Sequence, residues 1–101
     1  MSTGPAGEPI VIDVHVVWDL EDDPDGNVQH ILQHGLDMDE VEDVLLNPAN
    51  QVTVSRTSGN PIVFGYTETG RYIAVLFELI DDNPRTLYPL TAYDVPAPRG
   101  K

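Results

Sequence analysis

Four strand-like stretches, separated by residues that favour turns, fill the second half of the chain. They read QVTVSRT, PIVFGYT, RYIAVLFELI and TLYPLTAYDV, at residues 51–57, 61–67, 71–80 and 86–95. The connections SGN, ETG and DDNPR are typical of hairpins between antiparallel strands. Alternation places two apolar sets on single strand faces: Ile62, Phe64 and Tyr66 in one strand, and Ile73, Val75, Phe77 and Leu79 in the next. A sheet with one apolar face needs a covering layer.

Two helix-like stretches precede these strands and supply that layer. In residues 26–34 the apolar side chains recur at helical spacing, and Gly35 follows where a C-cap glycine is common. Asp37 and Glu40 have the spacing of a capping box, and the second helix ends at Asn47-Pro48. The apolar positions are Val28, Ile31 and Leu32 in the first helix, and Met38, Val41, Val44 and Leu45 in the second.

The stretch IVIDVHVVW, at residues 10–18, alternates well enough for a further strand, with His15 on its solvent side. The predicted fold is therefore α+β, of order β-α-α-β-β-β-β, with both helices on one face of a mostly antiparallel sheet. Pro89 favours an edge position for the last strand, because proline has no N–H to donate. The predicted core contains Trp18, Leu32, Val41, Leu45, Phe64, Val75 and Phe77.

The predicted organisation is a disordered arm at 1–9, one domain at 10–96 and a C-terminal tail at 97–101. No stretch approaches the roughly 20 apolar residues of a transmembrane helix. The start, MSTGPAGEP, lacks the features of a signal peptide, and the chain has no cysteine, so we expect a cytoplasmic protein without a membrane partner.

The formal net charge is −12, from seventeen acidic and five basic side chains. Binding to nucleic acid depends on Lys and Arg that neutralise phosphates, and four scattered arginines with one lysine make a weak footprint. We therefore expect no DNA binding by this chain alone, and RNA binding only if a local basic patch exists. A basic protein is the partner that this charge favours.

Several short motifs follow one another in a distinctive order: Trp18-Asp19, His34-Gly35 at the end of the first helix, Asn47-Pro48, GYTETGRYIAVLFE at 65–78 and TAY at 91–93. Their order and spacing resemble those of the BrnT family of small toxins from bacterial type II toxin–antitoxin pairs. The resemblance runs from about Val16 to Val95. It implies a RelE-like fold, a ribonuclease activity and a small antitoxin as partner.

Three basic positions of that family are replaced here. The family typically has a lysine soon after Trp-Asp, Lys-His-Gly at the end of the first helix, and Ser-Ala-Arg in the last strand. This chain has Glu21 or Asp22, Gln33 and Tyr93 at those places. Cleavage of RNA requires stabilisation of charge on the transferring phosphate, normally by Arg or Lys. The substitutions therefore predict a ribonuclease activity that is weak or lost.

The predicted catalytic residues are His34, Arg71 and Tyr93. His34 resembles the family histidine and suits a general acid or base, since histidine ordinarily titrates near neutrality. Arg71 would hold a phosphate, and Tyr93 would donate a hydrogen bond. Each has a structural alternative: a helix cap for His34, an exposed hairpin residue for Arg71 and a half-buried strand residue for Tyr93. Arg56 is expected at the opposite end of the sheet.

His30 and His34 lie four residues apart, the spacing of a metal-binding pair on a helix. The His-Glu-x-x-His motif has a glutamate after its first histidine, whereas Ile31 stands there in this chain. No third ligand is evident, and DLEDDPDG lacks the spacing of an EF-hand loop. We expect no metal and no cofactor.

Two functional hypotheses follow from the resemblance and from the replaced basic positions. The first is a divergent BrnT-like protein that acts through a small antitoxin or another basic protein partner, with weak or lost ribonuclease activity. The alternative is an active ribonuclease toxin of a type II pair.

Overall fold

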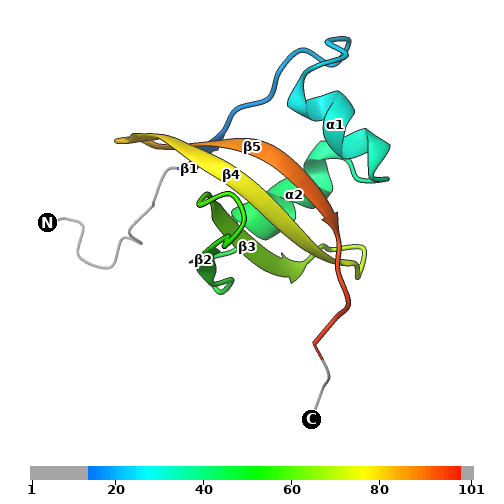
Figure 1. Cartoon of the computed structure of the whole chain (residues 1–101), viewed down its shortest axis with the longest axis vertical. Helices are drawn as coiled ribbons and strands as arrows, with labels where there is room; N and C mark the ends of the chain where they lie inside the picture. The colour runs from blue at the N-terminus through cyan, green and yellow to red at the C-terminus, as the bar shows by residue number, and fades with distance from the viewer. Residues whose placement is uncertain (1–13, 99–101) are drawn as a thin grey trace, which may run out of the picture.

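The computed structural model describes residues 14–98, which form one sheet and two helices (Figure 1). The elements are β1 Val14–Val16, α1 Asn27–Gln33, α2 Met38–Leu45, β2 Val52–Val54, β3 Pro61–Tyr66, β4 Tyr72–Asp82 and β5 Arg85–Asp94. The predicted order is confirmed. The predicted arm at 1–9, residues 10–13 of the predicted first strand and residues 99–101 of the tail lie outside the described part. Within that part, no helix has the length and apolar character needed to cross a membrane.

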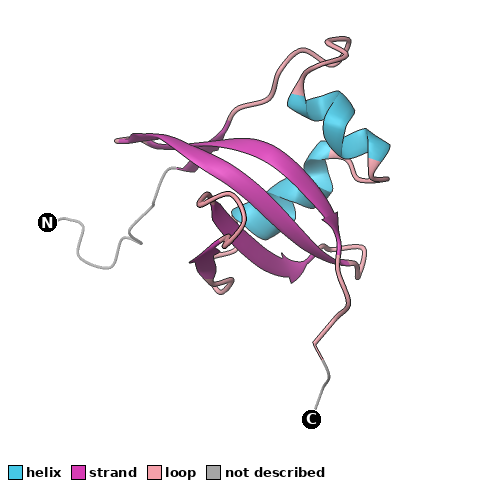
Figure 2. Ribbon diagram, in the orientation of Figure 1, coloured by secondary structure: helices cyan, strands magenta, loops and turns pink. Residues whose placement is uncertain are grey.

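The sheet has the strand order β1-β5-β4-β3-β2. β1 runs parallel to β5, and the other neighbours are antiparallel, so the sheet is mixed but mostly antiparallel as predicted. Figure 2 shows α2 crossing behind the sheet and α1 lying beside β5. Both helices contribute to one hydrophobic core on a single face of the sheet. This confirms the predicted α+β arrangement.

The core is formed by the inner sides of both helices and by the facing strand residues. Its buried members are Ile31, Leu36, Val41, Val44, Val63, Ile73, Val75, Phe77, Leu87 and Ala92, and Val14, Trp18, Met38 and Leu45 pack against it. Of the predicted core, Val41, Val75 and Phe77 are buried, and Trp18 and Leu45 are partly buried. Leu32 was predicted wrongly, since its side chain is 47% exposed on the outer side of α1.

Phe64 was also assigned to the wrong face of the sheet. Val63 pairs with Val75, and paired residues of antiparallel strands point to the same face, so Val63 contacts the helices. Phe64 pairs with Ala74 and lies on the opposite face, where its ring stacks on Tyr72 with 6.4 Å between centroids. Because β3 is apolar on both faces, alternation alone did not fix its orientation.

The prediction that the last strand lies at an edge is wrong for β5 as a whole. β5 lies between β1 and β4 in the sheet. Pro89 nevertheless has the setting that a proline needs, since β1 pairs only with residues 85–87 and has ended before Pro89 is reached. The β4–β5 register also shifts next to Pro89, opposite Phe77.

The predicted C-terminus of α1 and N-terminus of α2 are confirmed, and α2 ends at Leu45 with Leu46 as its C-cap, just before the predicted stop at Asn47-Pro48. Gly35 has a φ of 77°, a conformation that favours glycine. The N–H of Leu36 donates to the Ile31 carbonyl at 3.0 Å and that of Gly35 to the Leu32 carbonyl at 2.9 Å, which is a Schellman motif. In α2 both bonds of the capping box between Asp37 and Glu40 are present. The connection between the helices is therefore short and fixed.

Candidate functional site

His34, Arg71 and Tyr93 come from three different elements and meet at one corner of the molecule. His34 is the C-cap of α1, Arg71 precedes β4, and Tyr93 lies near the end of β5. The pairing of Ala74 with Tyr93 brings the start of β4 to the end of β5. The rings of His34 and Tyr93 are 6.4 Å apart, and Arg71 Nη1 donates to the carbonyl of Gly35 at 2.7 Å. The three predicted site residues are thus close together.

The guanidinium of Arg71 is already occupied by groups of the protein itself. Its Nε donates to Asp94 Oδ1 at 3.1 Å, and its Nη2 donates to Asp94 Oδ2. Its Nη1 contacts Glu40 Oε1 at 3.3 Å in addition to Gly35. A guanidinium has five N–H donors in a fixed planar fork. Among the described residues these contacts use both Nη1 donors, the Nε donor and one Nη2 donor, so one N–H is left for any ligand.

The two carboxylates also fix the charge states of this group. The two-point contact with Asp94 is the largest cause of a raised pKa at Arg71, and nearby Glu40 adds to it. The same contact lowers the pKa of Asp94. With Glu40, the surroundings of Arg71 carry two negative charges for one positive charge. A phosphate approaching this corner would meet net negative charge.

Hydrogen bonds from the β3–β4 hairpin hold Arg71 in this place. Thr67 Oγ1 accepts from the N–H of Arg71 at 3.0 Å, and Thr69 Oγ1 donates to Glu40 Oε2 at 2.9 Å. Glu40 therefore accepts hydrogen bonds from the hairpin, from Arg71 and from the N-terminus of its own helix. These bonds satisfy a carboxylate that is buried, since Glu40 is only 9% exposed. Arg71 links the helix connection, α2 and the end of the sheet. Arg71 is thus not a freely exposed hairpin residue, which was the structural alternative to a phosphate contact.

The two histidines of α1 lie on the outside of the helix. The rings of His30 and His34 are 5.5 Å apart in an edge-to-face arrangement, and both residues are exposed. In the described part of the chain, no group of three or more His, Asp or Glu side chains is placed to hold a metal ion. His34 occupies the C-cap position, where its backbone N–H bonds to the Ile31 carbonyl.

A hollow beside this corner is lined by carboxylates. It lies between α2 and the β3–β4 hairpin and has a volume of about 740 Å³. We call it the acidic hollow. The acidic residues that line it are Asp37, Asp39, Glu40, Glu42, Asp43 and Glu68. Sequence reasoning missed this feature, since Glu68 joins the acidic residues of α2 only when the hairpin folds against that helix.

The carboxylates of the acidic hollow differ in how they are used. Asp37 and Glu40 form the capping box, Glu42 accepts from Trp18 Nε1 at 2.7 Å, and Asp43 accepts from the N–H of Glu68 at 2.9 Å. The exposed carboxylates of Asp39 and Glu68 have no hydrogen bond or ion pair among the residues that the structure describes. These two side chains are available to a ligand.

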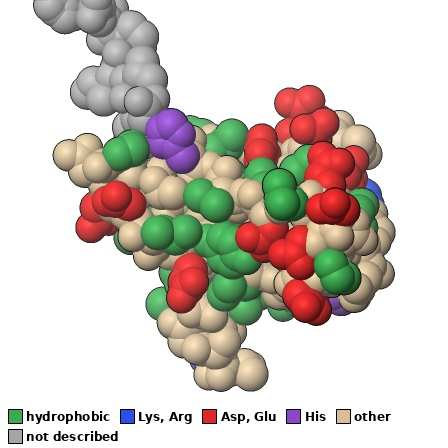
Figure 3. All heavy atoms as spheres, turned by 90° about the horizontal axis from the view of Figure 1, so that it is seen from above, with side chains coloured by type: hydrophobic (Ala, Val, Ile, Leu, Met, Phe, Trp, Pro, Cys, Tyr) green, Lys and Arg blue, Asp and Glu red, His purple; other side chains and the backbone are tan. Residues whose placement is uncertain are grey.

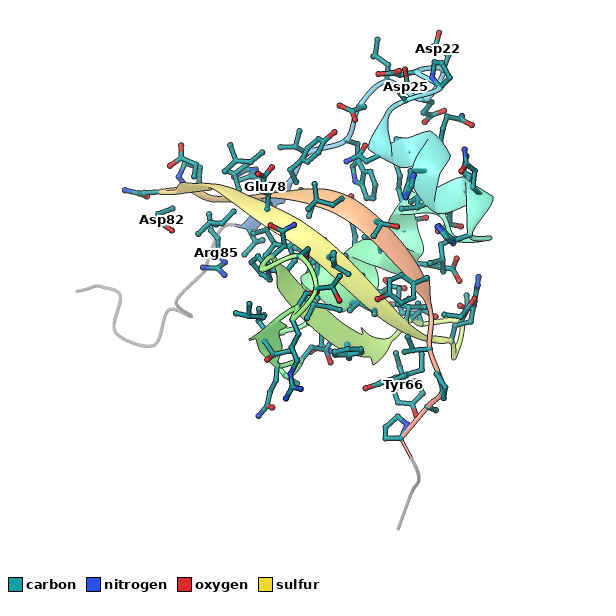
Figure 4. All side chains as sticks on the ribbon, viewed as in Figure 1. Asp22, Asp25, Tyr66, Glu78, Asp82 and Arg85 are labelled. Carbon is teal, nitrogen blue, oxygen red and sulfur yellow. The ribbon has the colours of Figure 1, made fainter. Side chains whose placement is uncertain are left out.

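Positive charge is scarce on the described surface. Its three arginines are Arg56, Arg71 and Arg85. Arg85, labelled in Figure 4, begins β5 and pairs with the end of β4, whereas Arg71 precedes the start of β4. The β2–β3 register places Arg56 towards the same end of the sheet as Arg85. In Figure 3 acidic side chains gather over the end of the molecule that carries α1. The described residues therefore form no local basic patch.

A second polar cluster, also missed at the sequence level, joins the loop after β1 to α1 and β5. The amide of Asn27 is 3% exposed and donates to the carbonyls of Val17 and Pro89, both at 3.1 Å. Asp19 Oδ2 accepts from the N–H of Asn27 at 2.9 Å and from Tyr88 Oη at 2.6 Å. These bonds lower the pKa of Asp19, and the bond to Asp19 raises the pKa of Tyr88 to about 12. This cluster anchors the edge of the sheet.

A comparison with protein-family models, curated proteins and solved structures finds no match to this chain. The geometry of the site therefore carries the functional argument.

Proposed function

We propose that this chain is a divergent BrnT-like protein that acts by binding a basic protein partner, with weak or lost ribonuclease activity. A small antitoxin is the partner that the family resemblance suggests, and the cytoplasm is the compartment in which such a pair would act. The observation that carries the proposal is the state of Arg71. The one arginine at the candidate site is engaged by Asp94, Glu40 and Gly35, so only one of its five N–H donors is left for a phosphate.

The acidic hollow supports a basic partner. It combines six carboxylates with Tyr66 and Leu46 at its margin, so it offers both charge and apolar contact. Asp39 and Glu68 supply acceptors without internal partners in the described structure. Lysine and arginine side chains recognise such surfaces through charge-assisted hydrogen bonds, and their long apolar stems pack on neighbouring aromatic groups. An extended basic segment fits this arrangement better than RNA, whose phosphates carry the same sign of charge as the hollow.

Binding of a synthetic lysine- and arginine-rich peptide, followed by fluorescence anisotropy, tests the proposal. The double variant Asp39→Asn/Glu68→Gln removes two exposed charges from the acidic hollow. Exposed ion pairs contribute about 0.2–1 kcal/mol each, so we expect the dissociation constant to rise about 2-fold to 30-fold. Higher salt should weaken binding by the wild-type protein.

Glu78→Gln/Asp82→Asn is the matched control. These two exposed residues lie in the second half of β4, outside the lining of the acidic hollow, and their loss changes the net charge by the same amount (Figure 4). The control should bind the peptide nearly as well as the wild type. Equal weakening in both double variants would show that net charge alone attracts the peptide, and would contradict a binding site in the hollow.

The active ribonuclease toxin stays a second candidate because of one observation. His34, Arg71 and Tyr93 meet at the same corner, with the rings of His34 and Tyr93 6.4 Å apart. In this hypothesis a phosphate of the RNA substrate displaces Asp94 from Arg71, and His34 acts as the general acid or base of the cleavage. Expression from a tightly controlled promoter distinguishes the two functions: growth arrest with loss of total RNA would favour the toxin, and normal growth favours the binding protein.

A further inference from the structure

One stretch of this acidic chain carries no carboxylate. From Val44 to Thr67 there is no Asp or Glu, although the chain has seventeen such residues, and Arg56 is the only charged side chain in the stretch. This neutral stretch, residues 44–67, contains the end of α2, β2 and β3. Two copies of a protein with a net charge of −12 repel each other at most orientations. The neutral stretch is the surface at which that repulsion is least.

The outer edge of the sheet within this stretch is an unpaired strand. β2 is the last strand in the sheet order, and no described element pairs with its outer side. Its two valines are unusually exposed, Val52 by 52% and Val54 by 63%. Natural edge strands are usually protected by being very short, or by lysine, proline, a bulge or an inward-pointing charge. β2 is short, with three residues, but the sequence Val-Thr-Val has none of the other devices.

The backbone direction of β2 can be derived from the hairpin that follows it. The N–H of Ser55 donates to the carbonyl of Asn60 at 2.8 Å, so Ser55 faces β3. Because backbone groups alternate along an antiparallel strand, Thr53 also faces β3, whereas Val52 and Val54 direct their N–H and C=O groups outward. The outer edge therefore presents two donors and two acceptors at alternate residues.

We propose that β2 pairs with β2 of a second copy of this chain, antiparallel and symmetric about Thr53. In this register Val52 of each copy lies opposite Val54 of the other, and each such pair exchanges two backbone hydrogen bonds. All outward groups of both strands are then satisfied. Shifting the twofold axis by one residue leaves part of these groups unpaired, so the register about Thr53 uses the short strand most completely.

Apolar contacts on the helix side of the sheet add to this pairing. Val52 pairs with Val63, so both valines of β2 lie on the face that carries the helices. Beside them is a groove of about 540 Å³, lined mainly by Leu45, Leu46, Val52, Val63, Phe77 and Leu87. The four valines at the twofold axis would extend this apolar surface across the interface. The contact area is small, so we expect a weak dimer that dissociates on dilution.

A cysteine cross-link tests the register, because the chain has no cysteine of its own. Facing residues of a non-hydrogen-bonded antiparallel pair have Cα atoms about 4.5 Å apart, which falls within the range that a disulfide spans. Thr53→Cys should therefore form a disulfide dimer under mild oxidation. The control Leu20→Cys introduces a thiol at a position that is 77% exposed and far from β2 in sequence. Thr53→Cys should cross-link at least about tenfold faster, since pairing raises the local thiol concentration.

Sedimentation velocity of the unmodified chain provides the second measurement. The wild type should show a monomer–dimer equilibrium that shifts to dimer as salt is raised, because salt screens the repulsion between two acidic copies. Val54→Lys should be monomeric, with the circular dichroism of the wild type, and Leu20→Lys should associate like the wild type. A wild type that is monomeric at every concentration and salt, or equal cross-linking of both cysteine variants, would overturn the dimer. The edge would then be open to a strand of another protein.

Discussion

Individual side chains at the corner of the sheet serve the fold through their charges. Arg71 joins the carbonyl of Gly35 to the carboxylates of Glu40 and Asp94. At the other edge of β5, Asp19 accepts hydrogen bonds from Asn27 and Tyr88 and so links the loop after β1 to α1 and β5. In the first cluster Arg71 donates to two carboxylates and a carbonyl, and in the second the carboxylate of Asp19 accepts two hydrogen bonds. Such charge-assisted hydrogen bonds are stronger than those between neutral groups. These residues have polar chemistry of the kind found in active sites, but their partners belong to the same chain.

Tyr88 supplies a pH-dependent test of the second cluster. Its folded-state pKa is raised from 10.0 to about 12, chiefly by the hydrogen bond to Asp19. The folded protein therefore holds this proton more tightly than the unfolded chain does. The resulting stability is complete below pH 10.0 and is lost as the pH rises towards about 12.

Chemical denaturation across this alkaline range measures the effect. The wild type should lose more free energy of unfolding between pH 10 and pH 12 than Tyr88→Phe, in which the titrating group is absent. Tyr93→Phe is the matched control and should follow the wild type. If Tyr88→Phe and the wild type lose stability in parallel, the bond to Asp19 does not govern the titration of Tyr88.

At the scale of helices and strands, the sequence predicted the features that depend on one element or one hairpin, but not those that depend on contacts between distant strands. The capping box at Asp37 and the C-cap glycine at Gly35 were predictable, because each depends on bonds within one helix end. The face of β3 that packs against the helices was not predictable. Phe64 and Val63 are both apolar, and only the pairing with β4 decides which of them contacts the core. The parallel contact of β1 with β5 joins distant parts of the chain and has no local signal.

For the site residues too, some features could be predicted from the sequence and others could not. The register of β4 and β5 around their hairpin allowed the meeting of Arg71 and Tyr93 to be predicted. The engagement of Arg71 by Glu40 and Asp94 was not predictable, because it depends on how α2 docks on the sheet. The acidic hollow arises from that docking as well.

Phe77 and Phe64 allow a direct test of which sheet face carries the core. Phe77 is 2% exposed and packs between the sheet and the helices, so Phe77→Ala should reduce the free energy of unfolding by about 3–5 kcal/mol. Phe64→Ala removes the same ring from the face that carries no helix, where Phe64 is half-buried, and should cost less. Urea denaturation of the two variants measures the difference. Equal losses would mean that the face without helices is packed as tightly as the core.

At the scale of the whole molecule, charge is distributed very unevenly. The acidic side chains fall outside residues 44–67, and the described arginines are divided between the two ends of the sheet. A cleavage site for RNA needs convergent positive charge, whereas this surface offers a carboxylate-lined hollow and a neutral edge. This distribution supports our proposal that the molecule binds other proteins, with a basic partner at the acidic hollow and a second copy at β2.

Incubation of purified protein with RNA at physiological salt tests this interpretation most directly. We expect the wild type, His34→Ala and Arg71→Ala to leave the RNA equally intact, because Arg71 is bound by carboxylates and no described basic patch attracts the substrate. Thermal unfolding should confirm that His34→Ala is folded. Cleavage by the wild type at neutral pH that is lost in folded His34→Ala and Arg71→Ala would contradict the account, and would assign an active ribonuclease site to the corner formed by His34, Arg71 and Tyr93.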